Sequence, residues 1–484
     1  MSMRKRRTTK AGLAAVMLLG AILGGCAGGT TGADAPAFDP DEPVTLKAMY
    51  MNEQAFHQTY GNLFRAKYPN VQFEVVETIG IFGEGKDPVE EFANLVAEQQ
   101  PDIVVMSPEQ YELLAAEGTL ADLEPLMQQS GFGTDGFVEG VVEQLRSLGS
   151  GKLYGLAPTF NMKALYYNKS LFDQYGVPYP TDGMTWEDVF ALAARFPSDG
   201  PEESRVYGLA SSMFTFSAFD LVKGVAASKE LSYLNADATA LTMDNDGWRE
   251  VFRQVVEAYK GGSVALPTPL QAAGSPMDGA KRTISIGGDG DAFNSGRAAM
   301  LIDGPMALNP MIRMAGKDAP TFERGLVTMP VDANYPDTSN AFSLSQIFGV
   351  TAGSGLTEAA WEFVRYVNSG EFADLRSGTA TELSSLVGYA TDKNGVSLEP
   401  FYKLRPGQTR ESSLLPKGFS AAFRTIAEEE TRAAVDGAKT VDEAFASLVA
   451  RATDALTAAV ATGETERGGG GAFGGGGVSA VFIR

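Results

Sequence analysis

The sequence contains very little of two residue types on which much protein chemistry depends. Its 484 residues include one cysteine, Cys26, and one histidine, His57. An internal disulfide, a zinc site built from Cys and His ligands, and Cys–His catalysis are therefore excluded within this chain. A Ser-His-Asp triad would have to use His57. That residue lies in an apolar-periodic segment, residues 53–68, which predicts an amphipathic helix, so we interpret His57 as a helix-surface residue.

Basic residues are also few. Lys and Arg number 39 against 60 Asp and Glu, which gives a net charge of −21 at pH 7. Such a surface repels nucleic acid and anionic headgroups, so nucleic-acid binding and polybasic membrane docking are set aside. We predict no cofactor and no metal, because the aspartate-rich residues 244–247 and 289–291 do not continue into an EF-hand loop. A catalytic carboxylate pair stays open as an alternative, although no pair can be singled out.

The amino-terminal segment indicates export. Five basic residues precede an apolar run, residues 11–25, which is shorter than the roughly 20 residues that span a bilayer. Its end, Leu-Gly-Gly-Cys at residues 23–26, resembles the lipobox of bacterial lipoproteins. The resemblance implies a signal peptide over residues 1–25, lipidation of Cys26, and a lipid anchor on the extracytoplasmic face of the cell membrane. An ordinary signal peptide with a chance cysteine is the alternative.

The remainder of the chain predicts a folded α/β protein after a flexible tether, residues 26–43. A chain of 484 residues suits two domains rather than one. Strand and helix patterns alternate from residue 44 to residue 106, which predicts βαβ units and mainly parallel sheets flanked by helices. The strand-like segments are Val44–Tyr50, 71–76 and Ile103–Met106, and the helix-like segments are 53–68 and Pro88–Gln99.

Polar residues follow two of these strands. Asn52 comes after the first strand, where it can cap the next helix, and Ser107 forms a capping box with Gln110 after Ile103–Met106. Thr185 with Asp188, and Thr440 with Glu443, make further capping boxes. Ligands of open α/β sheets bind at the carboxyl ends of the strands, so we expect ligand contact from one or both of the first two junctions.

Three blocks of sequence, taken together and in order, carry a resemblance to a known protein family. Residues 151–188 read GKLYGLAPTFNMKALYYNKSLFDQYGVPYPTDGMTWED, residues 293–305 read FNSGRAAMLIDGP, and residues 359–369 contain AAWEFV and YVNS. Together they resemble extracellular solute-binding protein family 1, the substrate-binding lipoproteins of ABC importers, many of them for sugars. The resemblance covers about residues 44–460. It implies a two-lobed, periplasmic-binding-protein-like fold of type II with a hinge between the lobes.

The resemblance also implies where each lobe begins and ends. The chain would cross between the lobes near residues 158–165 and 329–342. Lobe one would comprise residues 44–157 with about 340–377, lobe two about 164–328 with 378–460, and a glycine-rich disordered tail residues 461–484.

The aligned motifs nominate Met106, Ser107, Glu109, Asn161 and Met306 as ligand-binding residues. Asn52 joins them because it follows the first strand, and Tyr50 and Phe160 join them as candidate replacement platforms. The predicted set is Tyr50, Asn52, Met106, Ser107, Glu109, Phe160, Asn161 and Met306. Met106 and Met306 stand where sugar-binding relatives carry aromatic residues, so they would form a soft apolar wall instead of a stacking platform. Tyr50, Phe160, Phe214 and Phe216 could supply replacement platforms, although packing in the core is an equally good interpretation of each.

These expectations combine into one function. The chain is predicted to be a monomeric, non-enzymatic receptor that captures a carbohydrate or oligosaccharide and delivers it to an ABC permease in the membrane. One alternative is an exported carbohydrate-active enzyme with a carboxylate pair. The other is a solute receptor that reports to a membrane sensor.

Overall fold

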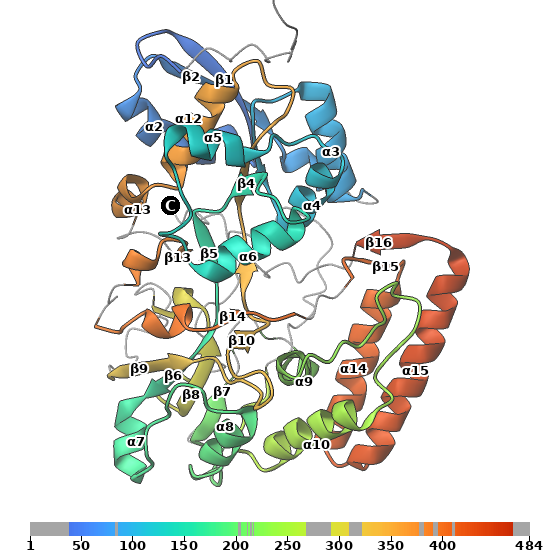
Figure 1. Cartoon of the computed structure of the whole chain (residues 1–484). Coiled ribbons are helices and arrows are strands. Elements are labelled where there is room, and N and C mark those ends of the chain that lie inside the picture. Colours follow the sequence, from blue (N-terminus) through green and yellow to red (C-terminus); the bar gives the residue numbers. More distant parts are fainter. Residues whose placement is uncertain are drawn as a thin grey trace, which may run out of the picture. The chain divides into compact units, whose positions relative to one another are not determined.

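Two mixed β-sheets with flanking helices organise the chain (Figure 1). The computed structural model describes residues 38–82, 86–201, 205–210, 212, 215, 217–267, 292–308, 322–376, 382–390, 395–408 and 412–467. All of these residues belong to one compact unit of the chain, Ala37–Arg484. The predictions for the signal peptide, Cys26, Phe214, Phe216 and residues 468–484 lie outside the described residues.

The first sheet has five strands in the order β2-β1-β3-β12-β4. Its strands are β1 (Val44–Tyr50), β2 (Val71–Glu77), β3 (Ile103–Met106), β4 (Gly155–Leu156) and β12 (Ile347–Val350). Strand β1 pairs in parallel with β2 and β3, whereas β12 runs antiparallel to β3 and β4. Its helices are α1 (Glu53–Phe56), α2 (Asn62–Lys67), α3 (Pro88–Gln99), α4 (Pro108–Ala116), α5 (Leu123–Ser130), α6 (Glu139–Leu148), α12 (Thr357–Val367) and α13 (Gly370–Arg376).

The second sheet has four strands in the order β7-β8-β6-β9. They are β6 (Ala164–Asn168), β7 (Tyr207–Ala210), β8 (Ala298–Asp303) and β9 (Arg324–Thr328). Its helices are α7 (Lys169–Tyr175), α8 (Trp186–Ala193), α9 (Phe219–Ser228) and α10 (Asp246–Lys260). Strand β6 runs antiparallel to both β8 and β9.

The sheets correct one expectation, because they are mixed and not mainly parallel. Strand β12 enters the first sheet from a distant part of the chain and reverses the direction set by β1 and β3. Other expectations are confirmed, since β1, β3 and α3 have the predicted bounds. The helix predicted over residues 53–68 forms α1 and α2 with a π-helical turn, His57–Gly61, between them. The His57 side chain is 24% exposed and packs against Phe56 and Phe73.

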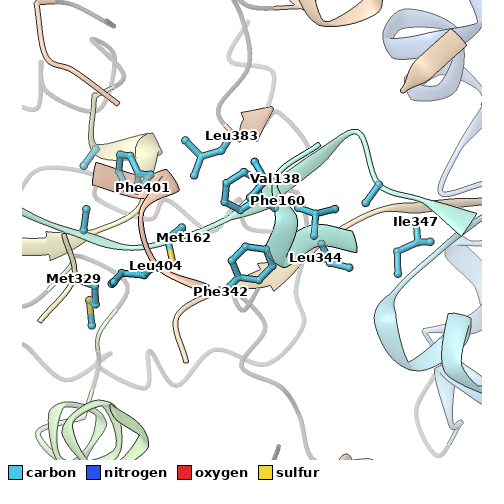
Figure 2. Close-up of a cluster of buried hydrophobic side chains, with 14 of the residues drawn as sticks. Val138, Phe160, Met162, Met329, Phe342, Leu344, Ile347, Leu383, Phe401 and Leu404 are labelled. Atoms are coloured by element: carbon cyan, nitrogen blue, oxygen red, sulfur yellow. The ribbon is translucent and has the colours of Figure 1, made fainter. Parts of the chain in front are cut away.

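Three short strands form a small antiparallel sheet in the order β11-β5-β13. They are β5 (Thr159–Asn161), β11 (Ser343–Leu344) and β13 (Leu383–Ser384). Strand β5 lies in the first predicted crossing and β11 just after the second, whereas β13 was not anticipated. A buried apolar cluster surrounds them, and Figure 2 shows Phe160 among Phe342, Leu344 and Leu383. We call β11, β5 and β13 the hinge strands, because β5 and β11 lie in or beside the predicted crossings; the crossings and the lobe boundaries themselves stay predictions.

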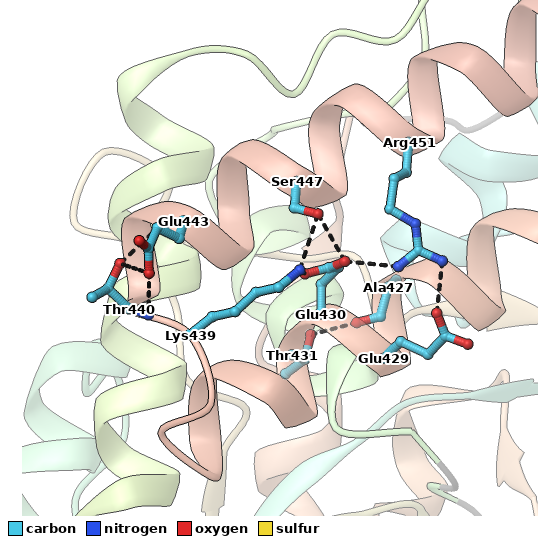
Figure 3. Close-up of polar contacts among 9 residues, drawn as sticks. All are labelled: Ala427, Glu429, Glu430, Thr431, Lys439, Thr440, Glu443, Ser447 and Arg451. Carbon is cyan, nitrogen blue, oxygen red and sulfur yellow. Dashed lines mark hydrogen bonds and ion pairs between the residues drawn. The ribbon is translucent and has the colours of Figure 1, made fainter.

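The carboxyl-terminal helices α14 (Phe419–Val435) and α15 (Val441–Thr462) pack against each other and against α10. Beyond them, β16 (Thr465–Arg467) pairs with β15 (Leu414–Pro416), so residues 461–467 are ordered and do not belong to the predicted tail. Among the described helices, α15 alone is long and apolar enough to cross a membrane. A core helix passes the same test, and α15 buries Phe445, Leu448 and Leu456 and carries part of the polar network in Figure 3. Two further short strands, β10 (Thr338–Ser339) and β14 (Arg405–Pro406), pair in parallel.

Candidate functional site

The carboxyl ends of β1 and β3 meet at one edge of the first sheet, because the two strands are parallel neighbours. Asn52 follows β1 and caps α1, its Oδ1 accepting from the backbone N–H of Ala55 at 2.8 Å. Ser107 follows β3, and its Oγ accepts from the backbone N–H of Gln110 at 3.3 Å. The predicted caps are therefore confirmed, and two helices begin at this edge with polar side chains beside it.

Glu109 adds a carboxylate to this edge. It lies in the first turn of α4 and is exposed, and Ser107 Oγ donates to Glu109 Oε2 at 2.8 Å. Because an ionised carboxylate accepts hydrogen bonds with two oxygens, Glu109 can receive a hydroxyl of a ligand as well as that of Ser107. The structure thus brings Asn52, Ser107 and Glu109 to the same edge.

Asn161 and Met306 do not belong to the first sheet. Asn161 ends hinge strand β5, opposite Ser343, and is partly exposed. Met306 is partly exposed in the 3-10 turn Pro305–Leu308, which begins just after the carboxyl end of β8 in the second sheet. The turn is held in place by Tyr166, whose hydroxyl donates to the carbonyl oxygen of Gly304 at 2.7 Å. The predicted residues therefore come from the first sheet, the hinge strands and the second sheet.

Two of the predicted residues are almost completely buried in the core of this structure. Phe160 is 0% exposed, and its ring stacks on Phe342 with centroids 5.0 Å apart and meets the edge of Tyr402 at 5.3 Å. Met106 is 1% exposed and lies opposite Ile347 in the pairing of β3 with β12. Alternate residues of a strand point to opposite faces, and these two point into packed layers. Neither side chain presents surface to a ligand, which corrects their assignment as ligand-binding residues.

Tyr50 is held by a short chain of hydrogen bonds. Gln346 Nε2 donates to Tyr50 Oη at 3.4 Å, and Tyr60 Oη donates to Gln346 Oε1 at 2.5 Å. The Tyr50 ring is 8% exposed and packs on Phe56 and Tyr60. Burial raises the pKa of the Tyr50 hydroxyl and raises the pKa of the Tyr60 hydroxyl further, so both stay protonated at neutral pH. The Tyr50 hydroxyl is therefore held in a fixed position, and the Tyr50 ring is covered and cannot serve as an open stacking platform.

A cavity lies beside the hinge strands. Its polar lining includes Tyr60, Thr159, Asn368, Arg376, Glu382 and Tyr389, and its apolar lining includes Phe372, Leu383 and Leu386. Glu382 accepts from Thr159 Oγ1 at 3.2 Å and from Ser345 Oγ at 2.6 Å, so it links the start of β13 to β5 and to the segment after β11. None of the eight predicted ligand-binding residues lines this cavity, although Tyr60 connects it to Tyr50 through Gln346.

Sequence reasoning missed Gln346 and Glu382. Each forms hydrogen bonds with residues that are far away in the chain: Gln346 with Tyr60, and Glu382 with Thr159. The local signal was a polar residue directly beside a short strand, which is too common to select one position.

The chemistry available at these positions is hydrogen bonding. Within the described part of the chain, no three His, Cys, Asp or Glu side chains are grouped so that they could hold a metal ion. Carboxylate, amide and hydroxyl side chains can bind the polar groups of a small molecule, because small-molecule sites fix their ligands with a few placed polar groups.

Comparison with known proteins relates this architecture to one family. Residues 83–383 match the family model described as bacterial extracellular solute-binding protein. Among solved structures, an extracellular solute-binding protein family 1 member from Alicyclobacillus acidocaldarius has a TM-score of 0.64 at 14% identity, over 87% of this chain and 100% of that one. The sugar-binding protein MalE from Xanthomonas citri has a TM-score of 0.59 at 14% identity, over 87% and 99% of the two chains.

A third structure is an ABC substrate-binding protein from Listeria monocytogenes in complex with cycloalternan. It has a TM-score of 0.54 at 20% identity and covers 87% of this chain and 100% of its own. At these identities the likeness concerns the fold alone. The predicted two-lobed α/β fold of the type II binding proteins is confirmed by it.

Proposed function

The chain belongs to the bacterial extracellular solute-binding proteins, and from this premise we propose that it captures a carbohydrate and hands it to the permease of an ABC importer. The family match over residues 83–383 carries the proposal. Support for a carbohydrate comes from solved structures of the same fold that hold cycloalternan or maltotetraose. Family membership also places the protein outside the cytoplasm.

The proposed mechanism is capture without catalysis. A sugar enters between the lobes, bridges polar groups of both, and shifts the equilibrium toward a closed arrangement that the permease recognises. Glu109 and Asn161 are the proposed hydrogen-bonding groups, with Ser107, Asn52 and the Tyr50 hydroxyl in support. Met306 is the proposed apolar wall. Lipid on Cys26 is the proposed anchor that keeps the receptor at the membrane surface.

A thermal-shift screen of the protein from Ala27 onward tests the function. The unit Ala37–Arg484 is retained whole in this fragment. A ligand at a hundredfold excess over its Kd stabilises the folded state by about 2.7 kcal/mol, so one or more mono- or oligosaccharides should raise the melting temperature clearly. Amino acids, peptides and polyols serve as competing classes. A rise with peptides alone would remove the carbohydrate assignment, and turnover of an oligosaccharide would establish an enzyme instead.

Substitutions then test the proposed residues. Asn161→Ala should weaken sugar binding about 2- to 13-fold, because a neutral hydrogen bond contributes about 0.5–1.5 kcal/mol. Glu109→Ala should weaken it about 13- to 160-fold, because hydrogen bonds to charged groups contribute about 1.5–3 kcal/mol. Titration calorimetry measures both affinities. Glu117→Ala, an exposed carboxylate at the other end of α4, is the matched control and should bind as the wild type does. Unchanged affinity in both test variants would exclude this site.

A further inference from the structure

An ion pair joins the carboxyl-terminal end of the described chain to the first sheet. Arg467 Nε lies 2.8 and 2.9 Å from the two carboxylate oxygens of Asp87, and Arg467 Nη1 donates to Ser413 Oγ at 3.2 Å. The Arg467 and Asp87 side chains are 21% and 20% exposed. The pair is therefore shielded from solvent more than an ordinary surface ion pair, for which screening removes most of the attraction.

Arg467 is fixed to elements of the second sheet. It belongs to β16, opposite Leu414 of β15, and these strands extend from α14 and α15. Helix α14 is tied to α9 because Glu428 accepts from Ser217 Oγ and from the backbone N–H of Ala218, both at 2.7 Å. Helix α15 packs on α10, and the segment after α10 pairs with β7 of the second sheet. These contacts connect Arg467 to the second sheet, so Arg467 should move together with that sheet.

Asp87 is fixed to the carboxyl edge of the first sheet. It caps α3, its Oδ1 accepting from the backbone N–H of Val89 at 2.8 Å. Helix α3 follows β2, the neighbour of β1, and Gln110 Nε2 donates to the carbonyl oxygen of Pro88 at 3.4 Å. Because Gln110 also caps α4 with Ser107, Asp87 stands beside the edge that carries the proposed sugar-binding residues.

We propose that Arg467 and Asp87 form a clasp between the two lobes that stabilises the closed arrangement and so determines solute affinity. A rotation about the hinge strands separates the facing edges of the lobes, and a contact at the carboxyl edge of the first sheet persists only while those edges are close. A contact made in one of two conformations biases the equilibrium toward that conformation. The clasp touches no solute, so its residues are positioning residues. The affinity part of the proposal rests on the proposed function, whereas the conformational part does not.

Fluorescence energy transfer between the lobes tests the clasp without any solute. The only cysteine of the chain is Cys26, so the fragment from Ala27 has none and accepts a specific dye pair at Glu117→Cys and Gln174→Cys. Both positions are exposed, the first at the end of α4 and the second on α7. In this background we expect Asp87→Asn and Arg467→Gln each to lower the transfer efficiency of the ligand-free protein. Asparagine still caps a helix well, so Asp87→Asn removes the charge and retains the cap.

The control is Lys417→Gln, which breaks an exposed ion pair with Glu464 beside the β15–β16 pair and does not involve the first sheet. It should leave the efficiency unchanged. The double variant Asp87→Asn/Arg467→Gln should match either single variant, because both remove one interaction. Unchanged efficiency in both single variants, or additive losses in the double variant, would overturn the clasp.

Titration with maltotetraose then separates the two proposals. If the wild type binds it, each clasp variant should raise the Kd about 2- to 5-fold, the size expected for a partly exposed ion pair. Equal affinities in wild type and variants would overturn the role of the clasp in affinity. A wild type that responds to no sugar would count against the proposed function, while the ligand-free efficiencies would still decide the clasp.

Discussion

Glu430 shows how a single buried charge is accommodated in this protein. Its carboxylate, on α14, is 3% exposed and receives hydrogen bonds from Lys439, Ser447 and Arg451, as Figure 3 shows. Burial raises the pKa of this carboxyl, but the hydrogen bonds from Lys439, Arg451 and Ser447 lower it by more, and the net pKa is lowered. The charged form is therefore the form that the fold stabilises.

Replacing Glu430 with Gln should lower the free energy of unfolding at pH 7 by about 1–3 kcal/mol, because two cations lose their buried partner. A carboxyl whose pKa is lower in the folded state contributes stability above its unfolded pKa of about 4.3. That contribution disappears as the pH falls through the folded pKa. Urea unfolding should therefore show the difference from wild type narrowing below about pH 4.

The matched control is Glu429→Gln, since Glu429 is 55% exposed and pairs with the same arginine, Arg451. It should change stability by less than about 1 kcal/mol. An equal loss in both variants, or a difference from wild type that does not depend on pH, would contradict the role given to Glu430.

The residues that sequence predicted well are those whose partners are close in the chain. Ser107 and Gln110 are three positions apart and form the expected capping box. Tyr50 and Gln346 are separated by most of the chain, and so are Asp87 and Arg467, so no local pattern marks those pairs. For the same reason the sequence left two interpretations of Phe160 open, because Phe342, which stacks on it in the core, lies far away in the chain.

At the scale of the element, the helix caps make a quantitative expectation possible. Thr440 caps α15, its Oγ1 accepting from the backbone N–H of Glu443 while the Glu443 carboxylate accepts from the backbone N–H of Thr440. Thr440→Ala should lower the free energy of unfolding by about 1 kcal/mol, since the first turn of the helix loses this partner. Chemical denaturation measures the loss.

Thr457→Ala is the control in the same helix, because Thr457 is exposed in the interior of α15. Alanine has the higher helix propensity, so this variant should be as stable as the wild type or slightly more stable. A loss at Thr457 as large as that at Thr440 would show that the cap is not the cause.

Elements of ordinary length were predictable, whereas very short ones were not. Strands β1 and β3 carry enough apolar residues to show a pattern, and their bounds were correct. Strand β13 has two residues, too few for any periodicity, so the third hinge strand stayed hidden. The mixed direction of the sheets was missed because periodicity identifies a strand but does not give its direction.

At the scale of the whole molecule, the proposed lipid anchor on Cys26 can be tested by removing it. We expect Cys26→Ala to release the protein from the membrane fraction into the medium, because no acyl chains remain to hold it. Its affinity for solute should be unchanged, since Cys26 precedes the compact unit Ala37–Arg484. Cell fractionation with immunodetection checks the release, with the wild type retained in the membrane fraction as the control. Retention of the variant would contradict the lipid anchor.

The place of β12 in the first sheet also sets the order in which the protein can acquire its structure. Strand β4 pairs with β12, and β12 separates β4 from β3, so this sheet stays incomplete until residues 347–350 have been synthesised. At about 5–20 residues per second, the ribosome needs roughly 10–40 s to extend the chain from β4 to β12. During that interval the amino-terminal half lacks an interior strand. For an exported chain, late closure of this sheet prolongs the time in which the polypeptide is still open enough to be threaded across a membrane.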